Sequence, residues 1–227
     1  MVFTPQTLSF LRSLKRNNDR EWFRARKDQY EEHVRGPMIA VVERLAVDFK
    51  SFAPELIASP KQSIFRIYRD TRFSSDKQPL KTHAAAVFRT RGFQNKEGAG
   101  LYFEVAPGWV WIGGGMWRPQ PSELVTLREH IADTWPELRR LTHAKAFASR
   151  FGQLEGETMT RVPRGYPPDH PAAEFLKHRQ FYGGAEFPAA LAPSRTFYPT
   201  LVATFKALMP LVRFLNETLI EGRREDS

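Results

Sequence analysis

The sequence contains no cysteine among its 227 residues. This absence excludes disulfide bonds, thiolate nucleophiles and the common zinc sites built from cysteine, and it favours a reducing compartment. Long apolar runs are also missing, because no stretch approaches the length of about eighteen apolar residues that indicates a membrane-spanning helix. The first twenty residues lack the charged-then-apolar layout of a signal peptide. Together these absences predict a cytoplasmic protein that does not enter a membrane.

Metal-ligand spacing is missing too. None of the histidines forms a His-x-x-x-His pair, and none has a cysteine companion. The six histidines are His33, His83, His130, His143, His170 and His178. We therefore predict no metal site, and the sequence identifies no cofactor.

What the sequence does contain is typical of a folded protein. Hydrophobic residues make up 41%, charged residues 26% and aromatic residues 13%, the last with 18 phenylalanines. A chain of this length can bury a sizeable core. We find no internal repeat and no linker, so we expect a single domain over residues 1–227, with residues 221–227 as a frayed tail.

Helical periodicity marks both ends of the chain. Leucines at steps of three predict a helix over 5–16, and Asp19 suits the N-cap of a charge-rich helix that meets a break or kink at Gly36-Pro37. Two further helices are expected over 121–133 and 134–149, and a short one over 171–178. Apolar residues recurring at three to four predict a long terminal helix over 195–220.

Strand signals occupy the middle of the sequence. Residues 63–69 and 84–90 are β-favouring, and residues 101–115 form a hairpin around Pro107-Gly108. In that hairpin one face is apolar, and the other carries aromatic side chains with the carboxylate of Glu104. The pattern predicts an α+β fold: a mainly antiparallel sheet of about four or five strands, packed against N-terminal helices and a long C-terminal helix.

Positive charge is concentrated in one segment. The chain has a net charge of +9, and residues 61–91 hold eight Lys/Arg and two Asp, a net charge of +6. Such a cluster attracts anions such as phosphate, carboxylate or nucleic acid. Arginine offers a planar fork to such groups, and lysine a point charge. The candidate ligand-binding residues are Arg66, Arg69, Arg72, Lys77 and Lys81, with Arg118 as an addition after the glycines 113–115.

The same cations also allow a structural interpretation. Arg66 or Arg69 could pair with Glu104 across the sheet, and Asp70 could tie the loop to Arg72. The glycines 113–115 could cradle a phosphate, but such glycines more often let a neighbouring strand pack closely. Ser74-x-x-Lys77 matches part of an acyl-transfer signature whose other parts are missing.

Two residues are candidates for proton transfer. Glu104 is the lone carboxylate on the aromatic hairpin face, and His170 follows the rigid segment 164–169 and could titrate near neutral pH. The sequence does not decide whether the protein is an enzyme, and it gives no oligomeric state.

Three functions fit these residues. The favoured one is binding of, or catalysis on, a phosphate- or carboxylate-bearing small molecule at a basic strand-loop pocket. A nucleic-acid-binding module is the main alternative, supported by a sequence pI near 10.0 and many aromatics, although no RNP pattern or helix-turn-helix is present. A structural or protein-interaction module, with the arginines paired internally, is the third.

Motifs spread over almost the whole chain resemble an uncharacterised family, domain of unknown function family 2461. They are Phe10-Leu11, Leu14, Asn17-Asn18, Trp22-Phe23, 65–74, Asp76-Lys77, 79–82, 100–104, 113–115, Trp117, 164–166 and His170-Pro171. Leu80 departs from the tyrosine expected there, which bears on local packing. The resemblance implies a single domain and brings no established activity, substrate or cofactor.

Overall fold

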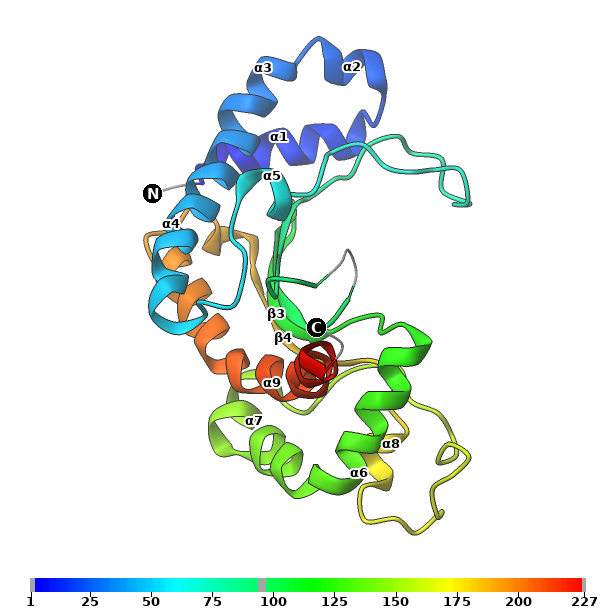
Figure 1. Ribbon diagram of the computed structural model, residues 1–227. Helices are drawn as coiled ribbons and strands as arrows, with labels where there is room; N and C mark the ends of the chain where they lie inside the picture. The colour runs from blue at the N-terminus through cyan, green and yellow to red at the C-terminus, as the bar shows by residue number, and fades with distance from the viewer. Residues whose placement is uncertain (1–2, 94–96, 226–227) are drawn as a thin grey trace. The chain divides into compact units, whose positions relative to one another are not determined.

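The computed structural model describes residues 3–93 and 97–225, with side chains described up to residue 220 (Figure 1). The chain forms two compact units, which are described separately. The first comprises Met1–Phe88, Tyr102–Ile112 and Glu186–Ala203, and the second comprises Arg89–Leu101, Gly113–Ala185 and Thr204–Ser227. The prediction of one domain is not tested by this division.

Short polar signals start the helices of the first unit. Helix α1 (Pro5–Arg16) begins with a proline in its first turn, as predicted. Asp19 caps α2 (Arg20–Arg24), because its carboxylate accepts hydrogen bonds from the backbone N–H groups of Glu21 and Trp22 at 2.7 and 2.9 Å. Helix α3 (Lys27–Tyr30) follows, and burial raises the pKa of the Tyr30 hydroxyl to about 12.

Where a break or kink was predicted at Gly36-Pro37 the backbone stays helical, and a π-helical turn lies directly before it. Residues Glu31–Arg35 (η1) form this wider turn, and α4 (Gly36–Phe52) continues from it without leaving helical geometry. The proline lacks an N–H, so it suits this first turn of α4. The carbonyl of His33 accepts a hydrogen bond from the buried hydroxyl of Thr7 on α1 at 2.6 Å, which ties the wide turn to α1.

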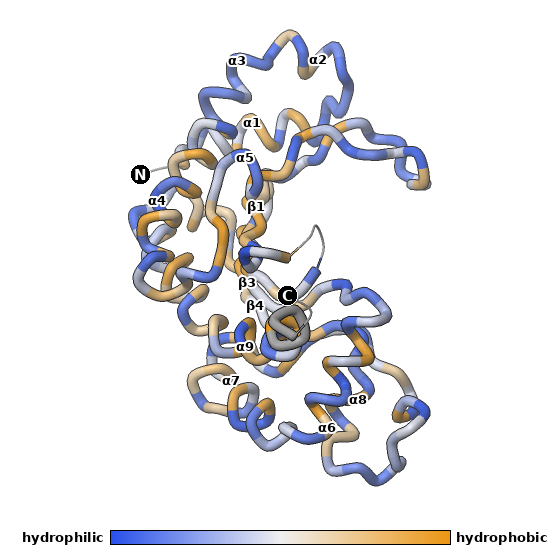
Figure 2. Tube along the Cα trace, viewed as in Figure 1, coloured by the Kyte–Doolittle hydropathy of each residue, from blue (hydrophilic) through white to orange (hydrophobic). Residues whose placement is uncertain are grey.

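Aromatic rings form the core of the first unit. Phe49 on α4 packs edge-on against Phe88 on strand β1 (Ala84–Arg89), with ring centroids 5.2 Å apart. Phe88 stacks on Phe103 of β2 (Gly100–Val105), and Phe103 in turn contacts Phe197, the first residue of α9 (Phe197–Glu225). In Figure 2 much of the trace along β1 is coloured hydrophobic. The N-terminal helices and the start of α9 therefore bury one face of the sheet.

The sheet has four antiparallel strands in the order β1-β2-β3-β4. Strand β3 (Trp109–Met116) follows β2 through the two-residue turn Pro107-Gly108, and the N–H of Ala106 donates to the carbonyl of Trp109 at 2.9 Å. Strand β4 is Phe181–Pro188. The predicted α+β class, the antiparallel sheet, the N-terminal helices and the long C-terminal helix are confirmed.

The predicted strand over 63–69 is wrong. Residues Pro60–Ser63 form a helical turn, α5, and the segment after it changes partners. Ile64 bridges to Ala86 of β1, whereas Tyr68 bridges to Leu80. Because no continuous ladder forms, side chains do not alternate in burial: Phe65, Arg66 and Tyr68 are all exposed.

The second unit is mainly helical. It contains α6 (Pro121–His143), α7 (Lys145–Phe151), α8 (Ala173–Leu176) and most of α9. The expected boundary between two helices at residue 134 is a kink inside α6, where Thr134 has non-helical φ and ψ. Gly183 of β4 leaves no room for a Cβ, which would lie 2.9 Å from Phe147 of α7 and 3.3 Å from Leu208 of α9.

A buried amide holds the second unit together. Asn216 on α9 accepts a hydrogen bond from the N–H of Ala99 at 2.7 Å and donates to the carbonyl of Ala99 and to the hydroxyl of Thr90 at 3.0 Å each. Its side chain therefore satisfies hydrogen-bonding groups at both ends of the connection from β1 to β2. The helix α9 runs to Glu225, so the predicted frayed tail has no described side chains, and its last two residues lie outside the described part of the chain.

Candidate anion-binding site on the hairpin face

The hairpin of β2 and β3 has two different faces, as predicted. Leu101, Phe103 and Val105 are fully buried, as are Val110 and Ile112. The opposite side carries Tyr102, Glu104, Trp109 and Trp111, all partly or largely accessible to solvent. We call this second side the hairpin face. The alternation follows from the two-residue repeat of a strand and from burial on one side only.

Glu104 is the polar centre of the hairpin face. Its Oε2 accepts a hydrogen bond from the Tyr102 hydroxyl at 2.6 Å, and its Oε1 accepts one from Nε1 of Trp109 at 2.9 Å. The side chain of Glu104 is only 18% exposed. Burial, together with the charge of Glu104 and its hydrogen bond, raises the pKa of Tyr102 well above its ordinary value, so the hydroxyl remains a donor.

His83 lies beside this carboxylate and was not among the predicted proton-transfer residues. Its Nε2 is 3.7 Å from Oε2 of Glu104. Burial lowers the pKa of His83 below its ordinary value, the charge of Glu104 opposes this, and the charges of Lys81 and Arg69 add to the lowering. The lowered pKa favours the neutral form of the imidazole. The pairing depends on residue 83, just before β1, lying next to β2, which no local pattern in the sequence reveals.

Lys81 is a half-buried cation next to this group. Its Nζ lies 4.7 Å from the centre of the Phe65 ring, a cation–π contact. Among the described residues no carboxylate pairs with it. Burial and the charge of Arg66 lower the pKa of Lys81, so two cations lie close enough to repel each other. Such a pair is stabilised by an anion between its members.

The other predicted cations brace a protruding loop, residues 67–81, which we call the basic arm (Figure 1). Arg69 forms an ion pair with Asp76, and Arg72 forms a two-pronged one with Asp70, at 3.0 and 2.8 Å. The hydrogen bonds from Arg72 lower the pKa of the Asp70 carboxyl to about 2. Lys77 donates to the carbonyl of Thr71 at 3.1 Å.

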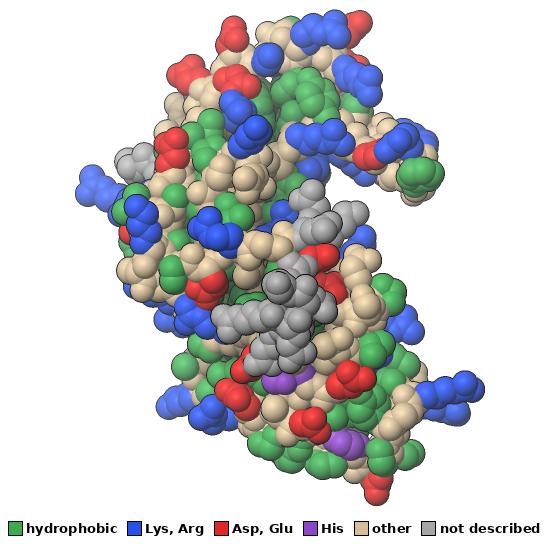
Figure 3. Space-filling view, in the orientation of Figure 1, with side chains coloured by type: hydrophobic (Ala, Val, Ile, Leu, Met, Phe, Trp, Pro, Cys, Tyr) green, Lys and Arg blue, Asp and Glu red, His purple; other side chains and the backbone are tan. Residues whose placement is uncertain are grey.

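The free end of the arm is apolar. Phe73 is 95% exposed, the most exposed large hydrophobic side chain among the described residues. Figure 3 shows basic side chains along the arm and a hydrophobic group at its end. The arm therefore presents an aromatic ring between cations that are largely paired within the arm itself.

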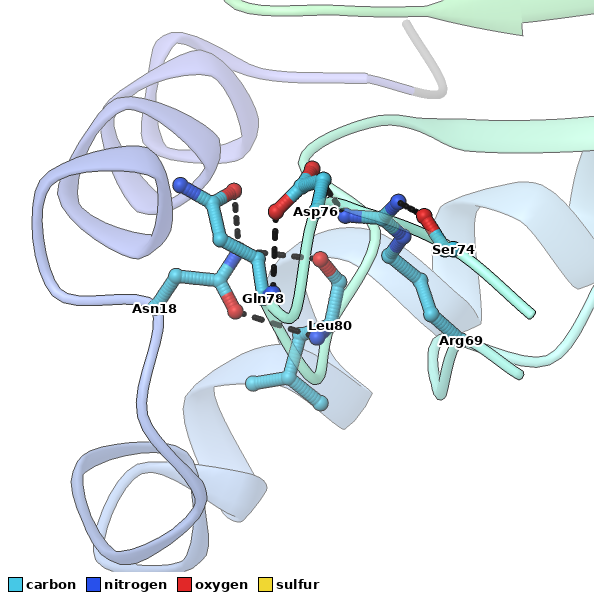
Figure 4. A network of polar contacts seen from close by, with 6 residues as sticks. All are labelled: Asn18, Arg69, Ser74, Asp76, Gln78 and Leu80. Atoms are coloured by element: carbon cyan, nitrogen blue, oxygen red, sulfur yellow. Dashed lines mark hydrogen bonds and ion pairs between the residues drawn. The ribbon is translucent and has the colours of Figure 1, made fainter. Parts of the chain in front are cut away.

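The side chain of Asn18 fastens the arm to the connection between α1 and α2. Its Oδ1 accepts a hydrogen bond from the N–H of Leu80 at 3.0 Å, and its Nδ2 donates to the carbonyl of Leu80 at 2.9 Å. Figure 4 shows this pairing, with Gln78 as a further partner of the same amide and Arg69 bound to Asp76 and Ser74. Asn18 thus fixes the backbone directly before Lys81.

The remaining predicted residues belong to the second unit. Arg118 is exposed beside Trp117, which packs on Tyr182 with ring centroids 4.7 Å apart. Nδ1 of His170 accepts a hydrogen bond from the N–H of Ala172 at 3.0 Å, which supports the start of α8. Neither residue belongs to the unit that carries the hairpin face.

The glycines 113–115 lie where strands approach each other. A Cβ on Gly114 would lie 2.7 Å from the Leu101 side chain, and one on Gly115 would lie 2.2 Å from the carbonyl oxygen of Phe181. Gly115 also has a φ of +137°, which side chains rarely adopt. This geometry agrees with the packing interpretation of these glycines.

The described residues contain neither a metal-binding group nor a membrane-spanning helix. No group of three or more histidine, aspartate or glutamate side chains is arranged to hold a metal ion within residues 3–93 and 97–225. In the same residues, no helix combines the length and the apolar character needed to cross a bilayer.

The fold and the site together define an α+β protein in which two cations, Lys81 and Arg66, lie beside an aromatic, carboxylate-centred hairpin face. A family model described as "Conserved hypothetical protein (DUF2461)" matches residues 6–214. The chain belongs to this family, which confirms the resemblance inferred from its motifs. No curated protein and no solved structure matches the chain.

Proposed function

We propose that the protein binds a small molecule bearing a phosphate or carboxylate at Lys81 and Arg66, beside the hairpin face. The observation that supports this is the half-buried Lys81 ammonium, which has a neighbouring cation and no carboxylate partner among the described residues. A buried charge without a partner is costly, and an anionic ligand would remove that cost. Arg69 and His83 add positive or polar groups on the same side.

Not every predicted cation has the same role in this proposal. Arg72 and Lys77 are engaged within the arm, and Arg69 pairs with Asp76. For these three the scaffold interpretation is the simpler one, because their charges are already compensated. Lys81 and Arg66 are the pair that an anion would bridge.

The proposal also includes proton transfer, by one pair of side chains. Glu104 and His83 lie 3.7 Å apart, and a neutral imidazole can accept a proton from a bound ligand. Both oxygens of Glu104 already accept hydrogen bonds, so His83 has the better geometry for that step. The cytoplasm is our proposed location, from the absence of cysteine.

Isothermal titration with inorganic phosphate and with succinate tests the proposal directly. Lys81→Gln should weaken binding by about tenfold or more, because a charge-assisted hydrogen bond is lost. Lys50→Gln, which removes an exposed lysine in the last turn of α4, is the matched control and should leave binding unchanged. Equal loss in both variants, or no binding of either anion to the native chain, would refute the proposal.

Nucleic acid is a second candidate, and one observation favours it. Three exposed aromatics, Phe65, Tyr68 and Phe73, each adjoin an arginine in sequence, and bases stack on such rings while arginine contacts phosphate. Fluorescence anisotropy with a labelled ten-nucleotide single strand at two salt concentrations tests it. Affinity that falls steeply with salt supports this candidate, and the absence of binding at low salt rejects it.

A further inference from the structure

Phe65, beside the hairpin face, forms a row of adjoining rings with Tyr102 and Trp111 of that face. The ring of Tyr102 lies 6.2 Å from that of Phe65 and 5.7 Å from that of Trp111, measured between centroids. Phe65 and Trp109 are each 37% exposed. The neighbouring rings are tilted against each other by 61° and 57°, so a planar ligand would stack on one ring and meet the next ring edge-on. Both arrangements offer dispersion contacts.

Glu104 holds Tyr102 of this row, and Trp109 of the same face, in place. Its two carboxylate oxygens take the polar ends of Tyr102 and Trp109, so each ring is fixed by a hydrogen bond as well as by packing. Ordering these side chains before binding removes part of the entropy cost of binding. The carboxylate therefore has a positioning role, which accounts for a largely buried acid among aromatic side chains.

The cationic pair lies at the Phe65 end of the row. Lys81 contacts the face of the Phe65 ring, and the charge of Arg66 acts on Lys81. A stacking surface and an anion site are thus adjacent and share Phe65. A ligand with a planar ring and an anionic group would use both at once.

We propose that the ligand is a nucleoside monophosphate, whose base stacks on the row formed by Phe65, Tyr102 and Trp111 and whose phosphate lies at Lys81 and Arg66. This inference rests on the proposed function, because it assigns the anion of that site to a ring-bearing molecule. Glu104 is a positioning residue here, acting through Tyr102 and Trp109.

The test is a comparison of three probes on the full chain: inorganic phosphate, adenosine and adenosine monophosphate. Titration calorimetry should give the monophosphate about tenfold tighter binding than phosphate, because stacking of one base adds to the same phosphate contact. Adenosine should bind more weakly than the monophosphate. Tryptophan fluorescence should be quenched by the monophosphate and not by phosphate.

Matched variants identify the tryptophan that the base contacts. Trp111→Phe should abolish most of the quenching, whereas Trp117→Phe, an exposed tryptophan of the second unit, should retain it. Glu104→Ala should weaken binding of the monophosphate but not of phosphate, and Glu104→Gln should restore part of it, since its amide oxygen can still accept hydrogen bonds. Trp109→Phe, at a partly exposed position, should give a smaller loss of the same kind, because it removes one of the two hydrogen bonds to Glu104.

The outcomes separate the two proposals. Equal affinities for phosphate and the monophosphate, with no quenching that depends on Trp111, would overturn the stacking surface and leave the anion site standing. Adenosine binding as tightly as its monophosphate would overturn the assignment of the phosphate to Lys81. No binding of any of these three probes would overturn this inference, and the proposed function would fall with it if succinate did not bind either.

Discussion

Replacing Asn18 by alanine tests how the basic arm is held. The substitution removes the hydrogen bond that the Leu80 N–H donates and the one that its carbonyl accepts, at 3.0 and 2.9 Å. Leu80 itself is fully buried, so water does not replace these partners freely. With roughly 1 kcal/mol for each bond, Asn18→Ala should destabilise this end of the arm by about 2 kcal/mol.

Hydrogen exchange followed by NMR measures this local destabilisation at single residues. The amide of Leu80 should exchange about thirtyfold faster in Asn18→Ala, since about 2 kcal/mol less is needed to open it. The amide of Lys81 donates to the carbonyl of Ile67 at 2.8 Å and should keep more of its protection. Binding of phosphate should weaken as well, because Lys81 follows Leu80 directly.

Asn18→Asp is the informative control. Its carboxylate still accepts from the Leu80 N–H but cannot donate to the Leu80 carbonyl, so the amide of Leu80 should stay protected while the free energy of unfolding falls. Unchanged exchange of Leu80 in Asn18→Ala would refute the reasoning, because it would mean that this amide is protected by something other than the side chain of Asn18.

Three further predictions concern other groups. Asn216→Ala should lower the free energy of unfolding in urea by about 3 to 5 kcal/mol, because three buried hydrogen bonds lose their partner; a loss under 1 kcal/mol would contradict this. Arg72→Ala should raise the pKa of Asp70 from about 2 toward 3.8 in a carbon NMR titration. The native pair contributes to stability above the ordinary pKa and loses that contribution as the pH falls toward 2, so an unshifted carboxyl would exclude the pair in solution. Glu104→Gln should lower the pKa of His83 further, since it removes the charge that raises it. Because the folded-state pKa of this histidine lies below its unfolded value of about 6.5, its contribution to stability is lost as the pH falls below that value; a pKa that rises in the variant would contradict the contact.

Much of the fold follows from local patterns. The hairpin was predictable because strict alternation and one apolar face leave a single register that buries Leu101, Phe103 and Val105. The cap at Asp19 and the long helix α9 follow equally from short-range signals. These elements are specified by residues that are neighbours along the chain.

Elements that depend on distant partners were missed. Strand β4 contains two glycines and ends in a proline, which lowers its β-propensity, and its strand conformation depends on the close approach to Gly115 of β3. The segment 63–69 has high β-propensity but switches between β1 and the arm, so propensity alone gave the wrong element. In both cases pairing with distant segments, and not local propensity, decides the conformation.

The candidate site was likewise predictable only where local patterns specify it. The aromatic hairpin face with Glu104 was predictable from alternation. The contact of His83 with Glu104 and the fastening of Leu80 by Asn18 were not, because each joins segments at least twenty residues apart in sequence. No period or motif in either segment encodes such a pairing.

The π-helical turn at Glu31–Arg35 sets the rotation of α4 about its own axis, and so decides which of its side chains face the core. A π-turn amounts to one extra residue in an α-helix, and one residue corresponds to a rotation of about 100°. Deleting one residue there would turn α4 by that angle and carry Val41, Val42, Leu45 and Phe49 away from the core they fill. A single-residue deletion in this turn should therefore be far less tolerated than one in an exposed loop, and substitution of Thr7 should relax the turn without rotating the helix.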